Sequence, residues 1–344
     1  MKISAKLSIS VAMCTYNGAR FLQEQLASIA AQQRLPDEMV VCDDGSTDAT
    51  LEILEKFSQT VPFPVRIVRN PVNLGSTKNF EQAMRLCTGD LIALSDQDDI
   101  WLPHKLAVQE AVFVENADVG GVFSDAELID GRTKLLGRRL WSMSRFDLSK
   151  QQKFRAGYAP RVLLERNVAW GSTLMVRSAT QPLFRDIPAP WVHDSWMTWM
   201  IVLYSRMEFI EDPLIHYRLH ASQQLGIEEL THSMQLSLKE RLKKGKREDA
   251  SKHAARAKEL QVLYDCLSSR ADAQALTVLP ALRQAIGFFA DCGNPEGSHA
   301  SRTLQILKNT RNYRRYEHGL RALMRDLVLI FINPDNQAAT NRLP

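Results

Sequence analysis

The stretch Leu91-Ile92-Ala93-Leu94-Ser95-Asp96-Gln97-Asp98-Asp99-Ile100-Trp101 changes within a few residues from apolar to strongly acidic. Its apolar run 91–94 is too short for a helical period and predicts a buried strand whose carboxyl end delivers Asp96, Asp98 and Asp99 to a crevice. Three neighbouring carboxylates repel one another unless a cation or full solvation offsets their charge. Such oxygen ligands suit Mg2+ or Mn2+ together with substrate phosphates; a solvated Asp-rich turn is the alternative on composition alone.

The residues before this stretch repeat a rhythm of strand, loop and helix. Strands are predicted over 7–13, 38–42 and 65–68, and helices over 20–33, 49–57 and 76–87. This alternation predicts parallel strands with right-handed crossovers. Polar loops follow three strands, at Thr15–Asn17, Asp43–Asp48 and Asp96–Asp99. They converge on the carboxyl edge, where open α/β sheets bind ligands, which predicts a nucleotide site.

The sequence after Trp101 predicts a less regular continuation. Helices are predicted over 106–114 and 191–203, and strands over 119–124, 167–176, 209–210 and 214–220. Residues 131–160 carry many Lys and Arg side chains without clear periodicity, and we interpret them as a mobile, basic region near the mouth of the site. From about Leu225 the sequence becomes basic and mainly helical in pattern, with 19 Lys and Arg against 13 Asp and Glu over 225–344.

Composition and cysteine use bound the class of protein. The 344 residues are 45% hydrophobic and 24% charged, with a net charge of +4, as in ordinary soluble globular proteins. Five widely spaced cysteines without a CxxC pair predict reduced, mostly buried thiols rather than disulfides or a zinc site: Cys14, Cys42, Cys87, Cys266 and Cys292. No signal-peptide region opens the chain and no apolar run approaches the roughly 18 residues of a spanning helix, so we expect a cytoplasmic protein.

Six motifs stand in a fixed order along the chain: Thr15–Gly18, Val41–Asp48, Asn73–Gly75, Lys78–Glu81, Ser95–Trp101 and His193-Asp194. Together they resemble family-2 glycosyltransferases of the GT-A fold, and Asp-Gln-Asp-Asp-Ile-Trp with the later Tyr217–His220 resembles the bacterial rhamnosyltransferase-like branch. The resemblance implies an α/β catalytic domain over 1–224, Rossmann-like, with a mostly parallel central sheet flanked by helices. Its nucleotide-binding part would cover about 1–125 and its acceptor part about 126–224. Residues 225–344 would form a basic, helical C-terminal extension.

The resemblance also implies a donor site. Its contacts with a sugar nucleotide would be Thr15, Tyr16, Asn17, Asp43, Asp44, Lys78, Asp96 and Asp99. A carboxylate can accept a hydrogen bond from a base imide, and the flat face of a tyrosine can stack on a pyrimidine. The alternatives for the two loops are a strand-end cap and a helix N-cap.

The metal site implied by the resemblance joins two distant segments. Asp98 would be the direct ligand, Asp96 would contact the metal or ribose, and His220 would be the distal ligand of Mn2+ or Mg2+. His216 is the competing choice, and a structural histidine is the alternative for either. Residues 221–224 depart from the branch, which usually has an Asn there, so the last ligand stays open. The metal would neutralise a diphosphate leaving group.

Asp194 is the candidate general base of an inverting transfer, which needs one carboxylate to take the proton of the acceptor hydroxyl. The aromatic setting of Trp191, Trp196 and Trp199 would raise its pKa. Trp191, Trp196 and Gly171 would form the acceptor subsite. A helix N-cap is the alternative role of Asp194, and it is compatible with catalysis.

These features predict a metal-dependent inverting glycosyltransferase. Its donor would be dTDP-rhamnose or a UDP-sugar, its acceptor a cell-surface glycan or lipid-linked glycan, and it would have no nucleic-acid partner. The C-terminal region would rest on the inner face of the plasma membrane, or its apolar stretch 320–332 would pack on the catalytic domain.

Three other classes of protein fit these residues less well than a glycosyltransferase. A nucleotidyltransferase would want a Gly-rich, basic loop after the first strand, where residues 14–18 hold one Gly and no Lys. A non-catalytic sugar-nucleotide-binding subunit would be favoured if the acids or the base were missing, and all are present. A dinucleotide-binding oxidoreductase is excluded because no GxGxxG follows any strand.

Overall fold

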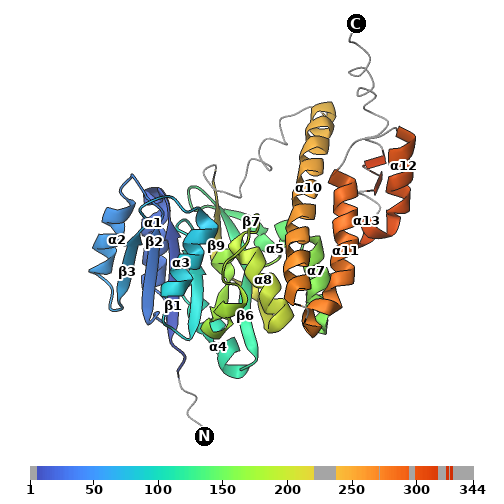
Figure 1. Cartoon of the computed structure of the whole chain (residues 1–344). Coiled ribbons are helices and arrows are strands. Elements are labelled where there is room, and N and C mark those ends of the chain that lie inside the picture. The colour runs from blue at the N-terminus through green and yellow to red at the C-terminus, as the bar shows by residue number, and fades with distance from the viewer. Residues whose placement is uncertain are drawn as a thin grey trace. The chain divides into compact units, whose positions relative to one another are not determined.

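The computed structural model describes residues 6–220, 238–270, 272–293, 299–316, 323–324 and 326–327. The chain divides into two compact units, Met1–Ile227 and Glu228–Pro344 (Figure 1). The predicted domain boundary at residue 224 lies outside the described residues. All five cysteines are free, as expected: Cys14 and Cys42 are buried and the other three are half-buried.

The first half of unit 1 is a parallel α/β layer. Its elements are β1 (Ile9–Thr15), α1 (Ala19–Ala30), β2 (Glu38–Asp43), α2 (Thr50–Ser58), β3 (Val65–Arg69), α3 (Ser76–Leu86) and β4 (Leu91–Ser95). The four strands run parallel in the order β3-β2-β1-β4. Every residue of β1 and β4 is buried, as expected of short apolar strands covered by helices on both faces. The predicted rhythm of parallel strands is confirmed.

The strand order reverses between β1 and β4, and this reversal positions the site. Helices α1 and α2 lie on one face of the sheet, and α3 lies on the other (Figure 1). Right-handed crossovers require this division, because β1 to β3 step in one direction and β4 returns on the far side of β1. The crevice at the carboxyl ends of β1 and β4 is therefore the switch point where such sheets bind ligands.

The second half of unit 1 extends the same sheet. After β4 the order continues β8 (Met175–Arg177), β6 (Val119–Asp130), β9 (Arg206–Leu219) and β5 (Ile100–Trp101). Strand β8 is antiparallel to β4 and β6, so the sheet is mixed. Helix α4 (Lys105–Glu115) follows β5, and a helical turn, Ser178–Leu183, and α8 (His193–Tyr204) follow β8. Strand β6 passes through residue 125, so the two predicted parts share one sheet.

Three predicted strands differ from the structure. Only the end of the predicted strand 167–176 is extended, because residues Gly171–Thr173 form a 3-10 turn before β8. The predicted strands 209–210 and 214–220 are one long strand, β9, whose pairing with β6 shifts register near Pro213. Such an irregularity interrupts the alternation on which the prediction depended.

Residues 131–160 are folded, so the prediction of a mobile region there is wrong. They form β7 (Leu135–Arg139), α5 (Leu140–Ser144), α6 (Leu148–Lys153), a π-helical turn (Phe154–Tyr158) and the start of α7 (Ala159–Glu165). Buried Trp141, Phe146 and Phe154 pack around Phe123 and Phe209, with ring centroids 4.9–5.9 Å apart. Helices of five to seven residues are too short to reveal a period, which explains the missed prediction.

Unit 2 consists of helices in its described part: α10 (Leu238–Arg270), α11 (Ala273–Gly293), α12 (His299–Lys308) and α13 (Thr310–Tyr316). Helices α10 and α11 approach closely at Gly293, where a Cβ would lie 2.7 Å from the backbone nitrogen of Ala254. The predicted helical character of this region is confirmed. Among the described residues, no helix combines the length and the apolarity needed to cross a membrane. Most of the apolar stretch 320–332 lies outside the described residues.

Candidate active site

The first two polar loops are tied together by their own side chains. Thr15 Oγ1 donates to Asp43 Oδ2 at 2.8 Å, and the backbone nitrogen of Asn17 donates to Ser46 Oγ at 2.9 Å. In return, Asn17 Oδ1 accepts from the backbone nitrogen of Thr47 at 2.9 Å. The loops therefore meet at one edge, as predicted. Thr15 and Asp43 are buried and hydrogen-bonded to their neighbours, and their contact with a donor stays a prediction.

Asp44 binds the loop that follows β3. Its Oδ1 accepts from Asn70 Nδ2 at 2.9 Å and from the backbone nitrogen of Leu74 at 2.7 Å, and its Oδ2 accepts from that of Gly75 at 2.9 Å. This loop borders a cavity of about 420 Å³, within the usual range of ligand pockets. Its lining residues are Tyr16, Asp44, Gly45, Arg69, Asn70, Pro71, Val72 and Asn73.

Two of the predicted donor contacts line this cavity, Tyr16 and Asp44. The Tyr16 side chain is 51% exposed, so its ring is available to a ligand. Arg69 and Pro71 were not predicted as site residues. Their position at the end of the third strand was the signal that could have identified them, since that strand also ends at the ligand-binding edge.

Gln97 connects the first loop to the acidic loop. Its Oε1 accepts from the backbone nitrogen of Tyr16 at 2.9 Å, and its Nε2 donates to the Tyr16 carbonyl oxygen at 3.1 Å. Gly18 makes room for this amide, because a Cβ there would lie 2.2 Å from Gln97 Oε1. No role was predicted for Gln97, although this residue lies inside the acidic motif.

Asp98 meets His220, the predicted distal ligand. His220 Nε2 lies 2.7 Å from Asp98 Oδ2, and the His220 ring packs on Phe21 with centroids 4.6 Å apart. His216 lies elsewhere on β9, with its Nε2 3.2 Å from Glu127 Oε2. Of the two competing histidines, His220 is therefore the one beside the acidic loop.

Arg218 holds the acidic loop in place. Its guanidinium is fully buried, and its Nε donates to the Asp98 carbonyl oxygen at 2.7 Å. Its Nη2 donates to Glu24 Oε2 at 2.8 Å, and its backbone nitrogen donates to Asp99 Oδ1 at 3.0 Å. The guanidinium also lies over the Phe21 ring at 4.6 Å. Asp99 is thus a buried acceptor in this network, and its predicted contact with a donor sugar stays a prediction.

Burial and neighbouring carboxylates raise the pKa of two acids of the site, Asp96 and Asp99. Burial, then the charges of Asp99, Asp98 and Asp194, hold the pKa of Asp96 well above its usual value. Burial and Asp98 raise the pKa of Asp99 to about 7. The pKa of the Tyr217 phenol also rises, first through burial and then through the charges of all four acids. Asp96 therefore lies within electrostatic reach of the other three carboxylates, and this arrangement favours a cationic ligand.

The donor set at this edge is compatible with Mg2+ or Mn2+. Within the described part of the chain, no three acid, histidine or cysteine side chains converge as a complete metal site. Asp98 and His220 already touch, and Asp96 stands two residues before Asp98. Ions of this kind are commonly held by one or two protein ligands, with substrate phosphates and waters completing the shell. The residues present thus fit an ion that a diphosphate completes.

Asp194 lies inside the first turn of α8, because the helix begins at His193 and Val192 occupies the N-cap position. The N-cap alternative is therefore wrong. Its Oδ2 accepts from the backbone nitrogen of Gly171 at 3.1 Å, and its Oδ1 accepts from that of Ser195. Burial raises the pKa of Asp194 to about 6, against the lowering effect of these two N–H groups. A carboxylate with such a pKa suits a general base near neutral pH.

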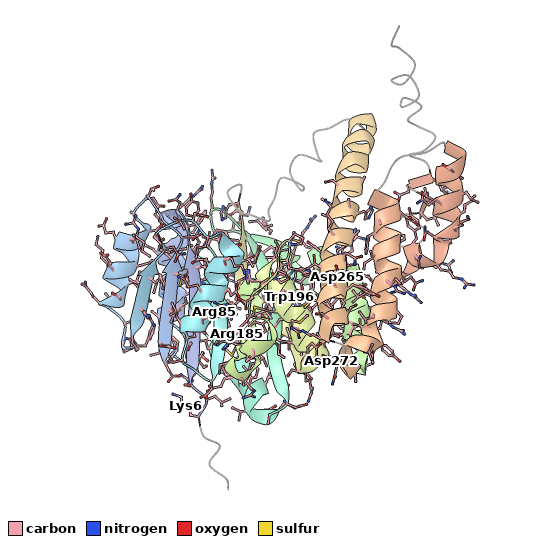
Figure 2. All side chains as sticks on the ribbon, in the orientation of Figure 1. Lys6, Arg85, Arg185, Trp196, Asp265 and Asp272 are labelled. Atoms are coloured by element: carbon pink, nitrogen blue, oxygen red, sulfur yellow. The ribbon has the colours of Figure 1, made fainter. Side chains whose placement is uncertain are left out.

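Of the predicted acceptor residues, Gly171 binds Asp194, and Trp191 and Trp196 stand close to it in the sequence. Trp191 and Trp196 are 3% and 2% exposed, with their ring centroids 5.6 Å apart; Trp196 projects from α8 (Figure 2). Neither indole has the open face expected of a sugar-stacking surface, and the acceptor role stays a prediction. Gly171 packs against His193, since a Cβ there would lie 2.8 Å from His193 Nε2. The buried imidazole stacks on Phe80, with centroids 4.2 Å apart.

Lys78 lies on α3, which precedes the acidic loop in the chain. Its Nζ donates to Glu81 Oε2 at 2.8 Å and to the carbonyl oxygen of Ile187 at 3.0 Å. Arg85, labelled in Figure 2, also binds Glu81 and reaches Asp186 at 2.8 Å. The side chain of Lys78 is half exposed, and its donor contact stays a prediction.

A mixed sheet with an acidic loop at its switch point, flanked by helices and followed by a helical region, is the GT-A fold of nucleotide-sugar glycosyltransferases. Residues 10–163 match the family model described as glycosyl transferase family 2. Over these residues, which make up less than half of the chain, the protein is similar to glycosyltransferase family 2.

Curated relatives with glycosyltransferase names are similar to the chain over part of their length. An uncharacterised glycosyltransferase of Nostoc sp. is 26% identical over 223 residues, which cover 63% of this chain and 66% of the relative. A dTDP-rhamnosyl transferase of Shigella flexneri is 39% identical over 98 residues, or 27% of this chain and 34% of the relative. The match thus spans about two thirds of the Nostoc relative and about one third of the Shigella relative.

Solved structures share the fold at low sequence identity. The TarS fragment 1–349 of S. aureus, in complex with UDP-GlcNAc, has a TM-score of 0.53 at 18% identity, covering 94% of this chain and 91% of that one. The mannosyltransferase PcManGT from Pyrobaculum calidifontis, in complex with GDP-Man and Mn2+, has a TM-score of 0.52 at 17% identity. That likeness covers 96% of this chain and 87% of the other.

Proposed function

We propose that this protein is a metal-dependent, inverting glycosyltransferase that moves a sugar from a nucleoside diphosphate donor to a glycan or lipid-linked glycan. The observation that carries the proposal is the arrangement around the switch point. A contact between Asp98 and His220 fits a metal and diphosphate, and the carboxylate of Asp194, with its raised pKa, lies within electrostatic reach. The cavity beside Tyr16 supplies room for a nucleoside.

The proposed reaction forms one glycosidic bond and breaks one bond to phosphate. The acceptor hydroxyl oxygen attacks the anomeric carbon from the face opposite the diphosphate, and its proton passes to a carboxylate oxygen of Asp194. The nucleoside diphosphate departs with the electrons of the broken bond. A bound Mg2+ or Mn2+ would supply positive charge to that leaving group. Asp98 and His220 would hold the ion, with Asp96 close to it.

The donor is proposed to be dTDP-rhamnose or a UDP-sugar. The match to a dTDP-rhamnosyl transferase supports the first, and a relative from Escherichia coli named as a UDP-Glc-dependent glucosyltransferase supports the second, at 26% identity over 125 residues. The exposed ring of Tyr16 at the cavity offers a stacking surface to either pyrimidine.

The test is a panel of dTDP-, UDP- and GDP-sugars, each with Mn2+, with Mg2+ and with a chelator. Turnover of one donor, lost with chelator and in Asp98→Ala, would support the transferase and name the nucleotide. Metal-dependent binding of a donor without turnover, in the presence of glycan and lipid-linked acceptors, would favour the non-catalytic subunit. Absence of binding by every donor would contradict both.

We further propose that the C-terminal region, residues 225–344, contacts anionic membrane lipid. Its 19 Lys and Arg against 13 Asp and Glu support an electrostatic attraction of this kind. Co-sedimentation of the full chain with vesicles containing phosphatidylglycerol, at low and high salt, tests it. Binding that salt weakens is expected; a protein that stays unbound at low salt would refute the contact.

A further inference from the structure

A row of buried polar side chains runs from α4 to the turn beside Asp194. Lys105 and Gln109, one helical turn apart on α4, are both fully buried. Lys105 Nζ donates to Gln109 Oε1 at 2.8 Å and lies 4.1 Å from the centre of a Trp101 ring. Gln109 Nε2 in turn donates to the backbone carbonyl oxygen of Thr173 at 2.8 Å. The amide of Gln109 therefore has one fixed orientation, because the Thr173 carbonyl oxygen can only accept and must face Nε2.

The turn that Gln109 binds is the one that holds Asp194. The 3-10 turn Gly171–Thr173 is closed by the backbone nitrogen of Leu174, which donates to the Gly171 carbonyl oxygen at 2.9 Å. At the first residue of the turn, the backbone nitrogen of Gly171 donates to Asp194 Oδ2 at 3.1 Å. Gln109 thus fixes one end of a three-residue turn whose other end orients the Asp194 carboxylate.

Stability alone does not explain these two side chains. A buried lysine ammonium loses its hydration, and burial lowers the pKa of Lys105 to about 7. Replacing buried polar pairs by apolar side chains of similar volume is often neutral or stabilising. Buried polar groups that are fully hydrogen-bonded instead fix a single geometry. The geometry fixed here is that of the turn beside the candidate base.

We propose that Gln109, oriented by Lys105, is a positioning residue for Asp194. The inference rests on the proposed function, since it assigns the network to the base of that reaction. Gln109 acts through the Thr173 carbonyl oxygen and the Gly171–Thr173 turn. Its side chain forms its hydrogen bonds with Lys105 and Thr173 and none with the donor loops, so its loss should slow transfer without weakening donor binding.

The experiment compares four variants of the full chain with the wild type. Gln109→Met removes both hydrogen bonds at nearly constant volume. Gln109→Glu keeps an acceptor for Lys105 but, when ionised, has no hydrogen to donate to Thr173. Lys105→Met keeps the bond to Thr173 and removes the group that orients Gln109. Gln32→Met is the matched control. Gln32 is also buried and binds the Leu102 carbonyl oxygen at 2.8 Å and the Leu106 backbone nitrogen at 3.1 Å, so its loss disturbs the start of α4 and leaves the bond from Gln109 to Thr173.

The measurements are kcat for transfer, KM for the donor, the metal concentration for half-maximal turnover, and the midpoint of thermal unfolding. We expect kcat to fall about tenfold or more in Gln109→Met and in Gln109→Glu, with donor KM and metal dependence within about twofold of wild type. Lys105→Met should fall between these variants and wild type. Gln32→Met should lower the unfolding midpoint and leave kcat unchanged.

The inference alone is overturned if Gln109→Met and Gln109→Glu turn over like the wild type. It is also overturned if their kcat falls no further than that of Gln32→Met at equal loss of stability. A rise in donor KM with unchanged kcat also overturns it, because the network would then serve the donor. If the wild-type chain transfers no sugar under any condition of the donor panel, the proposed function fails first, and the inference fails with it.

Discussion

The Nε2 atom of His220 lies 2.7 Å from Oδ2 of Asp98, although 122 residues separate them in the chain. His216, four residues earlier and within β9, pairs with Glu127. If Asp98 and His220 share a metal, His220→Gln should raise the Mn2+ concentration for half-maximal turnover by about tenfold or more. His216→Gln is the matched control and should leave it unchanged. Equal effects of the two substitutions would remove His220 from the metal site.

Asp194→Asn should keep donor binding and lose transfer, because an amide cannot take the proton of the acceptor hydroxyl. The loss in kcat should be about 100-fold or more, the usual contribution of a general base. Donor binding is measured by calorimetry and transfer by product formation. Asp147→Asn is the control, since Asp147 caps α6 on the surface by accepting from the Lys150 nitrogen at 3.1 Å. Unchanged turnover in Asp194→Asn would exclude the role.

The pH dependence of kcat should show an acid limb near the pKa of Asp194, which burial raises to about 6. A base works only when ionised, so turnover should fall as the pH drops through this value and reach a plateau above it. About nine tenths of the carboxylate is ionised one pH unit above its pKa and about one tenth one unit below. The profile is measured at saturating donor and metal. A plateau extending well below pH 5 would contradict the assignment.

Two glycine substitutions should have opposite effects on stability. In Gly171→Ala the new Cβ would lie 2.8 Å from His193 Nε2, an overpacking that should cost about 1–3 kcal/mol of unfolding free energy and displace Asp194. In Gly287→Ala, within α11, the Cβ meets no atom within 4 Å, so the helix should gain roughly 0.5–1 kcal/mol. Denaturant unfolding of the full chain measures both. A stabilising Gly171→Ala would show that the turn relaxes freely.

The parallel half of the sheet could be predicted because each of its units is local in sequence. Strands β1 to β4 follow one another with a single helix between them, and each has an apolar run bounded by turn residues. The antiparallel half depends on contacts between distant segments, such as β6 with β9 and β4 with β8. Their alternation is broken by register shifts, and neither periodicity nor turn chemistry in one segment reveals its partner.

The same distinction between local sequence and contacts of distant segments applies to the candidate site. The acids could be predicted, because a strand end places them at the ligand edge by local sequence alone. His216 and His220 could not be separated, since residues four apart on an extended strand lie on the same side. The register of β6 opposite β9 decides between them by placing Glu127 opposite His216. The burial of Trp191 and Trp196 could not be predicted, because it depends on neighbours that the sequence around α8 does not specify.

Asp44 holds the loop after β3 largely through the backbone nitrogens of Leu74 and Gly75. Every residue except proline carries such a nitrogen, so this anchor does not depend on which side chains the loop displays. Pro71 and Val72, which face the cavity, are therefore exchangeable without loss of the anchor. In the proposed transferase, substitutions in this loop would therefore change the preferred base and leave the acidic loop unaltered.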